Sequence, residues 1–291
     1  MALHVTTQQL DYLVAVAGSK SLAEAATSVG VTPSALSQGL SELERRIGLP
    51  LFEREGRTRV LTDYGREVLD YAERIVGLTN DLDRWAEAAR EGQTGRIRLG
   101  LIDIAAVHYL ASALGLFRSG RPDTELTLTV APSASLVELL RTAQLDLAVV
   151  VEPPAPVDGV STAPLLVDDL AVYPPPGATV GPPPTWGPWV GFPAASHTRQ
   201  LIADWLNALG ADYRVDADSN QPEVLRRLVA LGLGWAVLPV IQAETEPAPL
   251  KRAPSAPRLS RQLVIARRDR SVVGPATSAL IELLASHSGQ S

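Results

Sequence analysis

The chain has 291 residues and a formal net charge of −6, which argues against a basic surface over its whole length. If the protein binds nucleic acid, the basic footprint must therefore be local. A hydrophobic fraction of 46% is ample for two domain cores, yet no apolar run approaches the roughly 20 residues of a membrane helix. The absence of cysteine excludes disulfides and thiolate chemistry. The first residues lack the basic start and apolar block of a secretory signal, so we expect a cytoplasmic protein.

Near the N-terminus the sequence predicts one short helix and then two helices joined by a tight turn. Ser21 can cap the first helix of this pair, and Glu24, three residues on, can close a capping box. Gly30 supplies the backbone freedom that a sharp helix exit needs. Thr32 can cap the next helix, with Pro33 at its first position, where no amide hydrogen bond is lost.

The second helix of the pair has a clean division of faces. Its apolar residues follow at spacings of three and four and predict one buried stripe, made of Leu36, Leu40, Leu43 and Ile47. Short polar side chains lie on its other sides, at Ser34, Ser37, Gln38 and Ser41. Such a helix can enter the DNA major groove and reach base edges with its first turns. The alternative is an ordinary helical hairpin with a solvated polar face.

Two short apolar segments follow, on either side of a polar loop that contains a glycine, and they indicate a β-hairpin. Its tip carries Arg54, Arg57 and Arg59. A hairpin behind a helix-turn-helix is typical of a wing, and arginines there suit contact with phosphates or the minor groove. The alternative is a solvated charged turn, because Glu53 and Glu55 dilute the positive charge.

Residues 1 to about 66 resemble the N-terminal domain of LysR-type transcriptional regulators. The matching stretches are QQLDYLVAVAGSKSLAEAATSVGVTPSALSQGLSELERRIGLPLFERE and RVLTDYGREVL. The resemblance implies a winged helix-turn-helix domain over residues 1–62. It also implies DNA-facing positions at Ser21, Thr32, Pro33, Ser34, Ser37 and Gln38, with the wing near Arg54, Arg57 and Arg59. Gly39 departs from the family, which usually has a longer polar or basic side chain there; a glycine costs about 1 kcal/mol of helix stability relative to alanine.

Residues 63–94 carry the clearest periodicity of the chain. Apolar side chains alternate spacings of four and three, at Tyr64, Val68, Tyr71, Ile75, Leu78, Leu82, Trp85 and Ala89. This heptad seam predicts a long helix that packs along another helix. We expect the partner helix to come from a second copy of the protein, as the family resemblance also implies; the alternative is a helix lying on its own C-terminal domain. Residues 91–95 are expected to end the helix and form a hinge.

From residue 95 onward, apolar strands alternate with helical stretches, which favours two α/β lobes with parallel strands. Strands are predicted over 96–101, 126–130, 145–151, 170–173, 189–192, 213–217 and 261–266, and in a segment that ends at Pro239. Helices are predicted over 104–118, 133–143, 198–209, 221–231 and 275–286. The pattern resembles the effector-binding domain of the same family, which is similar to periplasmic solute-binding proteins. We expect lobe I to comprise about 95–163 and 267–291, lobe II to comprise about 164–266, and the proline-rich stretch 174–188 to be a rigid extended loop.

Ligands of open α/β sheets bind beyond the carboxyl ends of strands, near helix N-termini. In lobe I this rule selects Ile102, Asp103, Ile104, Pro132, Ser133, Ala134, Ser135 and Glu152. In lobe II it selects Ser196, His197, Thr198, Asp218, Asn220 and Gln221. The alternative role for several of these residues is helix capping. An aspartate is a poor partner for a carboxylate unless it is protonated, so Asp103 favours an effector with an amine or an apolar portion.

The sequence offers no catalytic constellation. Neither His108 nor His197 has a serine, cysteine or carboxylate at a motif spacing, and no cluster has metal-ligand spacing. We therefore expect no enzyme, no metal and no cofactor. The function that the sequence favours is a sequence-specific DNA-binding regulator, a homodimer or homotetramer without a membrane partner, controlled by a small-molecule effector. Two alternatives stay open: a solute-binding α/β protein without DNA function, and a DNA-binding regulator without a ligand.

Overall fold

The computed structural model of the chain describes residues 4–55, 58–90, 95–246, 248–254, 256–269, 271 and 273–287. The chain divides into two compact units, Met1–Gln93 with Arg141–Gln144, and Thr94–Leu140 with Leu145–Ser291. Within the described residues, no helix combines the length and the apolar character that crossing a membrane requires.

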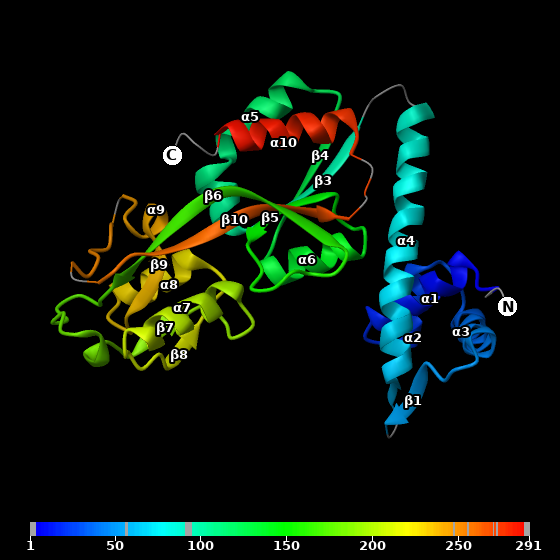
Figure 1. Cartoon of the computed structure of the whole chain (residues 1–291), viewed down its shortest axis with the longest axis horizontal. Coiled ribbons are helices and arrows are strands. Elements are labelled where there is room, and N and C mark those ends of the chain that lie inside the picture. Colours follow the sequence, from blue (N-terminus) through cyan, green and yellow to red (C-terminus); the bar gives the residue numbers. More distant parts are fainter. Residues whose placement is uncertain are drawn as a thin grey trace. The chain divides into compact units, whose positions relative to one another are not determined.

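Three short helices open the first unit: α1 (Thr7–Ala17), α2 (Leu22–Ser28) and α3 (Pro33–Ile47) (Figure 1). Ser21 caps α2 as predicted, since its side chain accepts a hydrogen bond from the amide of Glu24 at 3.2 Å. The predicted capping box is only half formed, because the Glu24 carboxylate accepts from the amide of Lys20, one residue before the cap. Gly48 ends α3 in the left-handed region, at φ 78°.

A hairpin and a long helix complete this unit. Strands β1 (Phe52–Glu55) and β2 (Thr58–Leu61) pair antiparallel, and α4 spans Asp63–Arg90. Gly65 lets the first turn of α4 pack on Leu51, the residue before β1, since a Cβ there would lie 2.0 Å from the carbonyl oxygen of Leu51. The core lies between α1, α2, α3 and the N-terminal half of α4, and its most buried side chains are Leu13, Ala25, Ala26, Leu36, Leu40, Leu43, Leu51 and Ala72.

The second unit is built on a six-stranded sheet with the order β4-β3-β5-β10-β6-β9 (Figure 1). Its strands are β3 (Arg96–Leu101), β4 (Glu125–Val130), β5 (Leu147–Val151), β6 (Val160–Tyr173), β9 (Ala236–Pro239) and β10 (Leu259–Arg268). Strand β3 is parallel to β4 and β5, as predicted. Strand β10 runs antiparallel to both β5 and β6, and β6 antiparallel to β9, so the sheet is mixed. A small parallel pair, β7 (Trp189–Gly191) and β8 (Val215–Asp218), forms a separate sheet, which a bridge between Trp189 and Trp235 links to the start of β9.

Two separate cores form on this sheet and define two lobes. The helical elements of the first lobe are η1 (Ala105–Tyr109, a π turn), α5 (Ala111–Gly120), α6 (Ser133–Arg141) and α10 (Pro275–His287). Those of the second lobe are α7 (His197–Ala208), α8 (Pro222–Ala230) and α9 (Val240–Ala243). Strands β6 and β10 run side by side through both lobes (Figure 1).

The predicted start of strand β6 at residue 170 is wrong. Strand β6 begins at Val160, ten residues before the predicted start at 170. The segment was missed because Pro164 and Asp168 interrupt its apolar pattern. Since β6 contributes Leu166 to the first core and Leu170 to the second, the boundary between lobes falls within a continuous strand. The proline-rich stretch 174–188 contains one short turn, η2 (Pro183–Thr185), and buries Trp186, whose ring stacks on that of Trp235 with centroids 5.9 Å apart.

Candidate nucleic-acid interface and effector cavity

Helix α3 presents one polar face to solvent and buries the other. Thr32 caps it, with its Oγ1 accepting a hydrogen bond from the amide of Ala35 at 3.2 Å, and Pro33 stands at the first position. The stripe Leu36, Leu40 and Leu43 is fully buried, and Ile47 is half-buried beside it. Ser34, Gln38 and Ser41 are exposed, and Ser37 is half-buried. The helix therefore has polar side chains at its N-terminal end, at Ser34, Ser37 and Gln38, that make no side-chain hydrogen bond with the described residues of the domain.

The structure gives a reason for the glycine inside this helix. A Cβ on Gly39 would lie 2.5 Å from Cδ2 and 2.6 Å from Cε2 of Tyr12. Tyr12 is a buried residue of α1, and its hydroxyl accepts a hydrogen bond from Gln8 at 2.9 Å. Gly39 thus faces α1. The glycine lowers the helix propensity of α3 but allows α1 and α3 to pack closely.

The wing is present as a hairpin, with Arg54 paired opposite Arg59 in its register. Arg57 lies outside the described residues, as do the side chains of Arg54 and Arg59. Their contact with DNA stays a prediction. Ser21, the remaining predicted position, is an exposed residue at the N-cap of α2.

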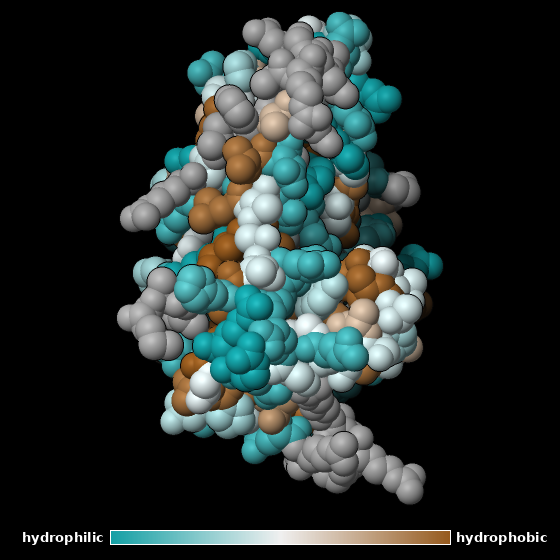
Figure 2. All heavy atoms as spheres, turned by 90° about the vertical axis from the view of Figure 1, so that its right-hand side faces the viewer, coloured by the Kyte–Doolittle hydropathy of each residue, from teal (hydrophilic) through white to brown (hydrophobic). Residues whose placement is uncertain are grey.

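Helix α4 has two apolar faces. One packs on α1 through Ala72, with Leu69 and Val76 partly buried beside it. The other carries the predicted seam and is open to solvent, with Leu78 54% and Leu82 61% exposed. Tyr64, Tyr71 and Ile75 are exposed as well, and Figure 2 shows hydrophobic residues gathered in a band along this helix. Val68 differs from the prediction because it is half-buried against the domain's own core. The side chains of Trp85 and Ala89 lie outside the described residues.

Between the lobes of the second unit lies a cavity of about 230 Å³, lined from both sides. The first lobe contributes residues that follow β3 and β4 and the last residue of β5, and the second contributes residues at the N-terminal ends of α7 and α8. Most of the predicted effector positions line it: Ile102, Asp103, Ile104, Pro132, Ser133, Ser196, Thr198, Asn220 and Gln221. Residues that the rule of strand ends and helix starts selected more than 100 positions apart in the chain, such as Ile102 and Gln221, thus lie around one cavity.

A buried polar network includes two residues that line this cavity, Arg261 and Thr198. Arg261, on β10, donates from Nε to Oδ2 of Asp168 at 2.7 Å and from Nη1 to Oγ1 of Thr198 at 2.6 Å. The hydroxyl of Tyr109 donates to Oδ1 of Asp168 at 2.7 Å. Burial, together with the negative charge of Asp168, raises the pKa of the Tyr109 hydroxyl well above its usual range. The network joins η1 of the first lobe to α7 of the second through the two long strands.

Comparison with known proteins identifies this architecture. The family described as "LysR substrate binding domain" matches residues 90–289, and "Bacterial regulatory helix-turn-helix protein, lysR family" matches residues 7–66. The transcriptional regulator DgdR of Burkholderia cepacia is 31% identical over 94% of this chain and 91% of its own. The chain belongs to the LysR family of bacterial transcriptional regulators.

Solved structures of LysR-type regulators share the fold. A full-length variant of OxyR from Pseudomonas aeruginosa superposes with a TM-score of 0.64, at 23% identity over 98% of this chain and 97% of that one. Full-length CbnR complexed with its target DNA superposes with a TM-score of 0.59, at 20% identity over 96% and 98%. This LysR-type protein is accordingly a DNA-binding transcriptional regulator with an effector-binding domain, of a family whose members bind small-molecule effectors and form oligomers.

Some predicted effector positions do not line the cavity of this regulator. Ala134 and Ser135 are exposed, because α6 turns them away after Ser133. The Ser133 hydroxyl accepts from the amide of Val151 at 3.1 Å and so ties the start of α6 to the end of β5. Asp218 ends β8 on the exposed surface.

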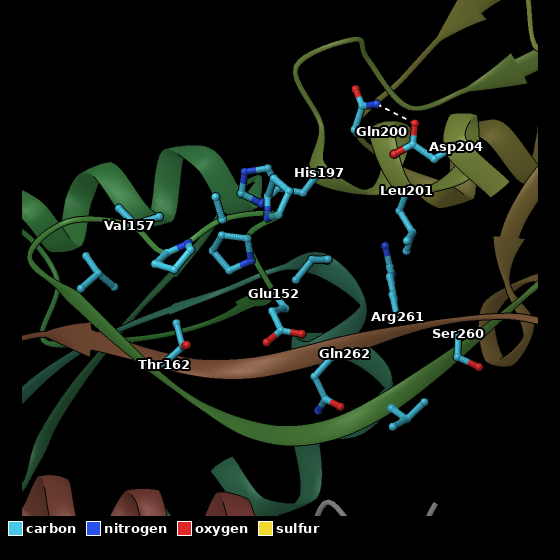
Figure 3. Close-up of a pocket in the computed structure, with 17 residues that line it drawn as sticks. Glu152, Val157, Thr162, His197, Gln200, Leu201, Asp204, Ser260, Arg261 and Gln262 are labelled. Carbon is cyan, nitrogen blue, oxygen red and sulfur yellow. Dashed lines mark hydrogen bonds between the residues drawn. The ribbon is translucent and has the colours of Figure 1, made fainter. Parts of the chain in front are cut away.

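Glu152 and His197 line a second, larger hollow of about 790 Å³ instead (Figure 3). In Figure 3, α7 and β10 bound this hollow, with Leu201 and Arg261 on its wall. Arg261 lines both hollows.

The strand-end rule missed several lining residues, and Arg261 is the important one. The others are Val130, Ala131, Val151, Phe192 and Pro222. A signal for Arg261 was available: it is a charged residue inside an apolar strand, as is Asp168, and buried charges occur in pairs.

Proposed function

We propose that the polar face of α3 reads base edges in the major groove and that Ser34, Ser37 and Gln38 make the contacts. The observation that carries this proposal is the division of the helix, whose apolar stripe is buried while Ser34 and Gln38 stay exposed. A glutamine can bond an adenine in bidentate fashion, and a serine can donate to or accept from any base. The hairpin β1–β2 then serves as the wing on the neighbouring backbone.

The exposed band on α4 supports pairing with the same helix of a second subunit. A two-fold dimer uses one patch twice, so the side chains of Tyr71, Ile75, Leu78 and Leu82 would meet their own copies. Such a dimer places two α3 helices about one turn of DNA apart, roughly 34 Å, or a multiple of this distance. Half-sites with that spacing are therefore expected in the operator.

The cavity between the lobes is the proposed effector site. A ligand there touches both lobes, so it favours one arrangement of the lobes over others. Two dimers linked through these domains would change their relative setting, and with it the spacing and bend of the bound DNA. Since such a regulator acts on chromosomal DNA by binding alone, we also propose that it works in the cytoplasm and catalyses no reaction.

One experiment tests the DNA contacts directly. Genomic fragments retained by the purified protein supply the binding site, and fluorescence anisotropy at fixed salt then compares Gln38→Ala with wild type. Loss of a bidentate base contact costs about 1–3 kcal/mol, which is about 5- to 150-fold in affinity for the selected site. Gln200→Ala, an exposed glutamine on α7 of the second unit, is the matched control and should bind as wild type. Equal binding by Gln38→Ala and Ser34→Ala would show that α3 does not read the bases.

A thermal-shift screen tests the effector site. A ligand at 100 times its dissociation constant adds about 2.7 kcal/mol of stability to the folded protein. Ala131→Phe fills part of the cavity and should abolish that stabilisation. A ligand that stabilises the variant as much as the wild type binds elsewhere.

A further inference from the structure

The cavity between the lobes carries one uncompensated negative charge. Asp103 follows β3 directly, lines the cavity and is half-buried. Within the described part of the chain, its carboxylate has no hydrogen bond or ion pair. A ligand that fills the cavity removes water from this carboxylate, which costs free energy unless the ligand brings a positive group to it. The first element of recognition is therefore an ammonium group.

The same cavity also presents groups that favour an anion. Arg261 is 5% exposed, and while Nε and Nη1 are bonded, its Nη2 has no partner among the described residues. Helices α6, α7 and α8 all begin at the cavity wall, with Ser133, Thr198 and Pro222 in their first turns. The positive ends of these helices attract negative charge. Among the residues that the structure describes, no side chain caps the first amides of α7 or α8.

The remaining wall is apolar and the volume is small. Ile102, Ile104, Val130 and Phe192 supply the apolar lining. The cavity has a volume of about 230 Å³. This is below the range of about 300–1,000 Å³ that is usual for drug-sized ligands.

We propose that the effector of this regulator is a small aliphatic α-amino acid, with its ammonium group at Asp103 and its carboxylate at Arg261 and the starts of α7 and α8. The inference rests on the proposed function, because it names the class of ligand for the same cavity. A zwitterion gives a partner both to the carboxylate of Asp103 and to Nη2 of Arg261. A simple acid or a simple amine gives a partner to only one of them. A short aliphatic side chain matches the apolar wall.

The test uses the full-length protein and titration calorimetry with glycine, L-alanine, L-valine and L-leucine. Two analogues of L-valine each lack one charged group: 3-methylbutanoate lacks the ammonium group, and isobutylamine lacks the carboxylate. A hydrogen bond to a charged group is worth about 1.5–3 kcal/mol, so at least one amino acid should bind tenfold or more tightly than analogues with one charge. Asp103→Asn should weaken its binding by a similar factor and leave the binding of 3-methylbutanoate unchanged or stronger. Asp218→Asn, an acidic residue that ends β8 outside the cavity, is the matched control.

Two outcomes overturn the inference, and they leave the effector site itself separately testable. Binding of 3-methylbutanoate as tight as that of L-valine, with no loss in Asp103→Asn, would show that the ammonium contact does not exist. Failure of all four amino acids to bind would exclude the class. In either case the cavity would still be the effector site if another ligand bound the wild type and lost its binding in Ala131→Phe. A ligand that bound Ala131→Phe as well as the wild type would place the effector elsewhere.

Discussion

The buried ion pair between β6 and β10 makes a quantitative prediction about how the lobes are held together. Asp168 is 0% exposed and accepts hydrogen bonds from Arg261 and from Tyr109. Asp168→Asn keeps the shape of the side chain and removes its charge, so the guanidinium of Arg261 stays buried without compensation. Breaking one partner of such a pair costs about 3–5 kcal/mol of folding stability.

Two companion variants separate the charge from the remaining contacts. Tyr109→Phe removes one hydrogen bond to a carboxylate that Arg261 still neutralises, so it should cost about 1.5–3 kcal/mol. The double variant Asp168→Leu with Arg261→Leu removes both charges at once. Replacing a buried pair by apolar side chains is often neutral or stabilising, so this protein should be more stable than Asp168→Asn.

Urea unfolding followed by tryptophan fluorescence measures these differences. Four of the five tryptophans lie in the second lobe, at Trp186, Trp189, Trp205 and Trp235. With a slope of about 3 kcal/mol/M, Asp168→Asn should lower the midpoint by about 1–2 M. The reasoning is refuted if Asp168→Asn unfolds within about 0.3 M of wild type, or if the double variant is the less stable of the two.

Three further predictions test other parts of the structure. Gly39→Ala gains about 1 kcal/mol of helix propensity, but its methyl group overpacks Tyr12 at a cost of about 1–3 kcal/mol. The melting temperature measured by circular dichroism should therefore fall, and a rise would contradict the close contact between Gly39 and Tyr12. Leu78→Glu on the exposed band of α4 should raise the dimer dissociation constant in sedimentation equilibrium by about 30-fold or more, since a two-fold dimer carries the substitution in both subunits. The control variant Glu67→Gln should leave the dissociation constant unchanged. Burial raises the pKa of Tyr213 to about 12, because the folded state disfavours the charged phenolate; the tyrosine therefore costs no stability through ionisation below about pH 10, and stability falls as the pH rises from about 10 through 12. Among the described residues that hydroxyl has no partner, so Tyr213→Phe should be at least as stable at pH 7 and lose less stability in the alkaline range; an unchanged alkaline profile would exclude this role.

The N-terminal domain could be predicted closely because its signals are local. Thr32 and Pro33 fix the start of α3 within two residues, and Gly48 fixes its end. The buried stripe follows from helical spacing alone. The reason for Gly39 could not be predicted in the same way, because it depends on the ring of Tyr12, which approaches from another helix. Sequence spacing shows which side of a helix a residue occupies, but not which neighbour covers it.

The effector cavity was predicted in outline for a similar reason. A strand end and a helix start are visible in the sequence, and a parallel sheet gathers the strand ends at one edge, which placed Asp103 and Ser133 together. The antiparallel strand β10 does not obey that rule, because it continues from the second lobe into the first and its third residue, Arg261, lines the cavity. Arg261 therefore reaches the site from within a strand and not from a loop.

Local sequence patterns could not predict the pairing of Arg261 with Asp168, since 93 residues separate the two in the chain. The sequence nevertheless limits the alternatives. A charged side chain inside an apolar strand must find a partner of opposite sign, because an isolated buried charge costs several kcal/mol. In LLVDDLAVY and LSRQLVIA, the charged residues stand near the point where each strand passes between lobes. A ligand that engages the remaining Nη2 of Arg261 would act on a buried contact that joins η1, β6, β10 and α7, and so on the angle between the lobes.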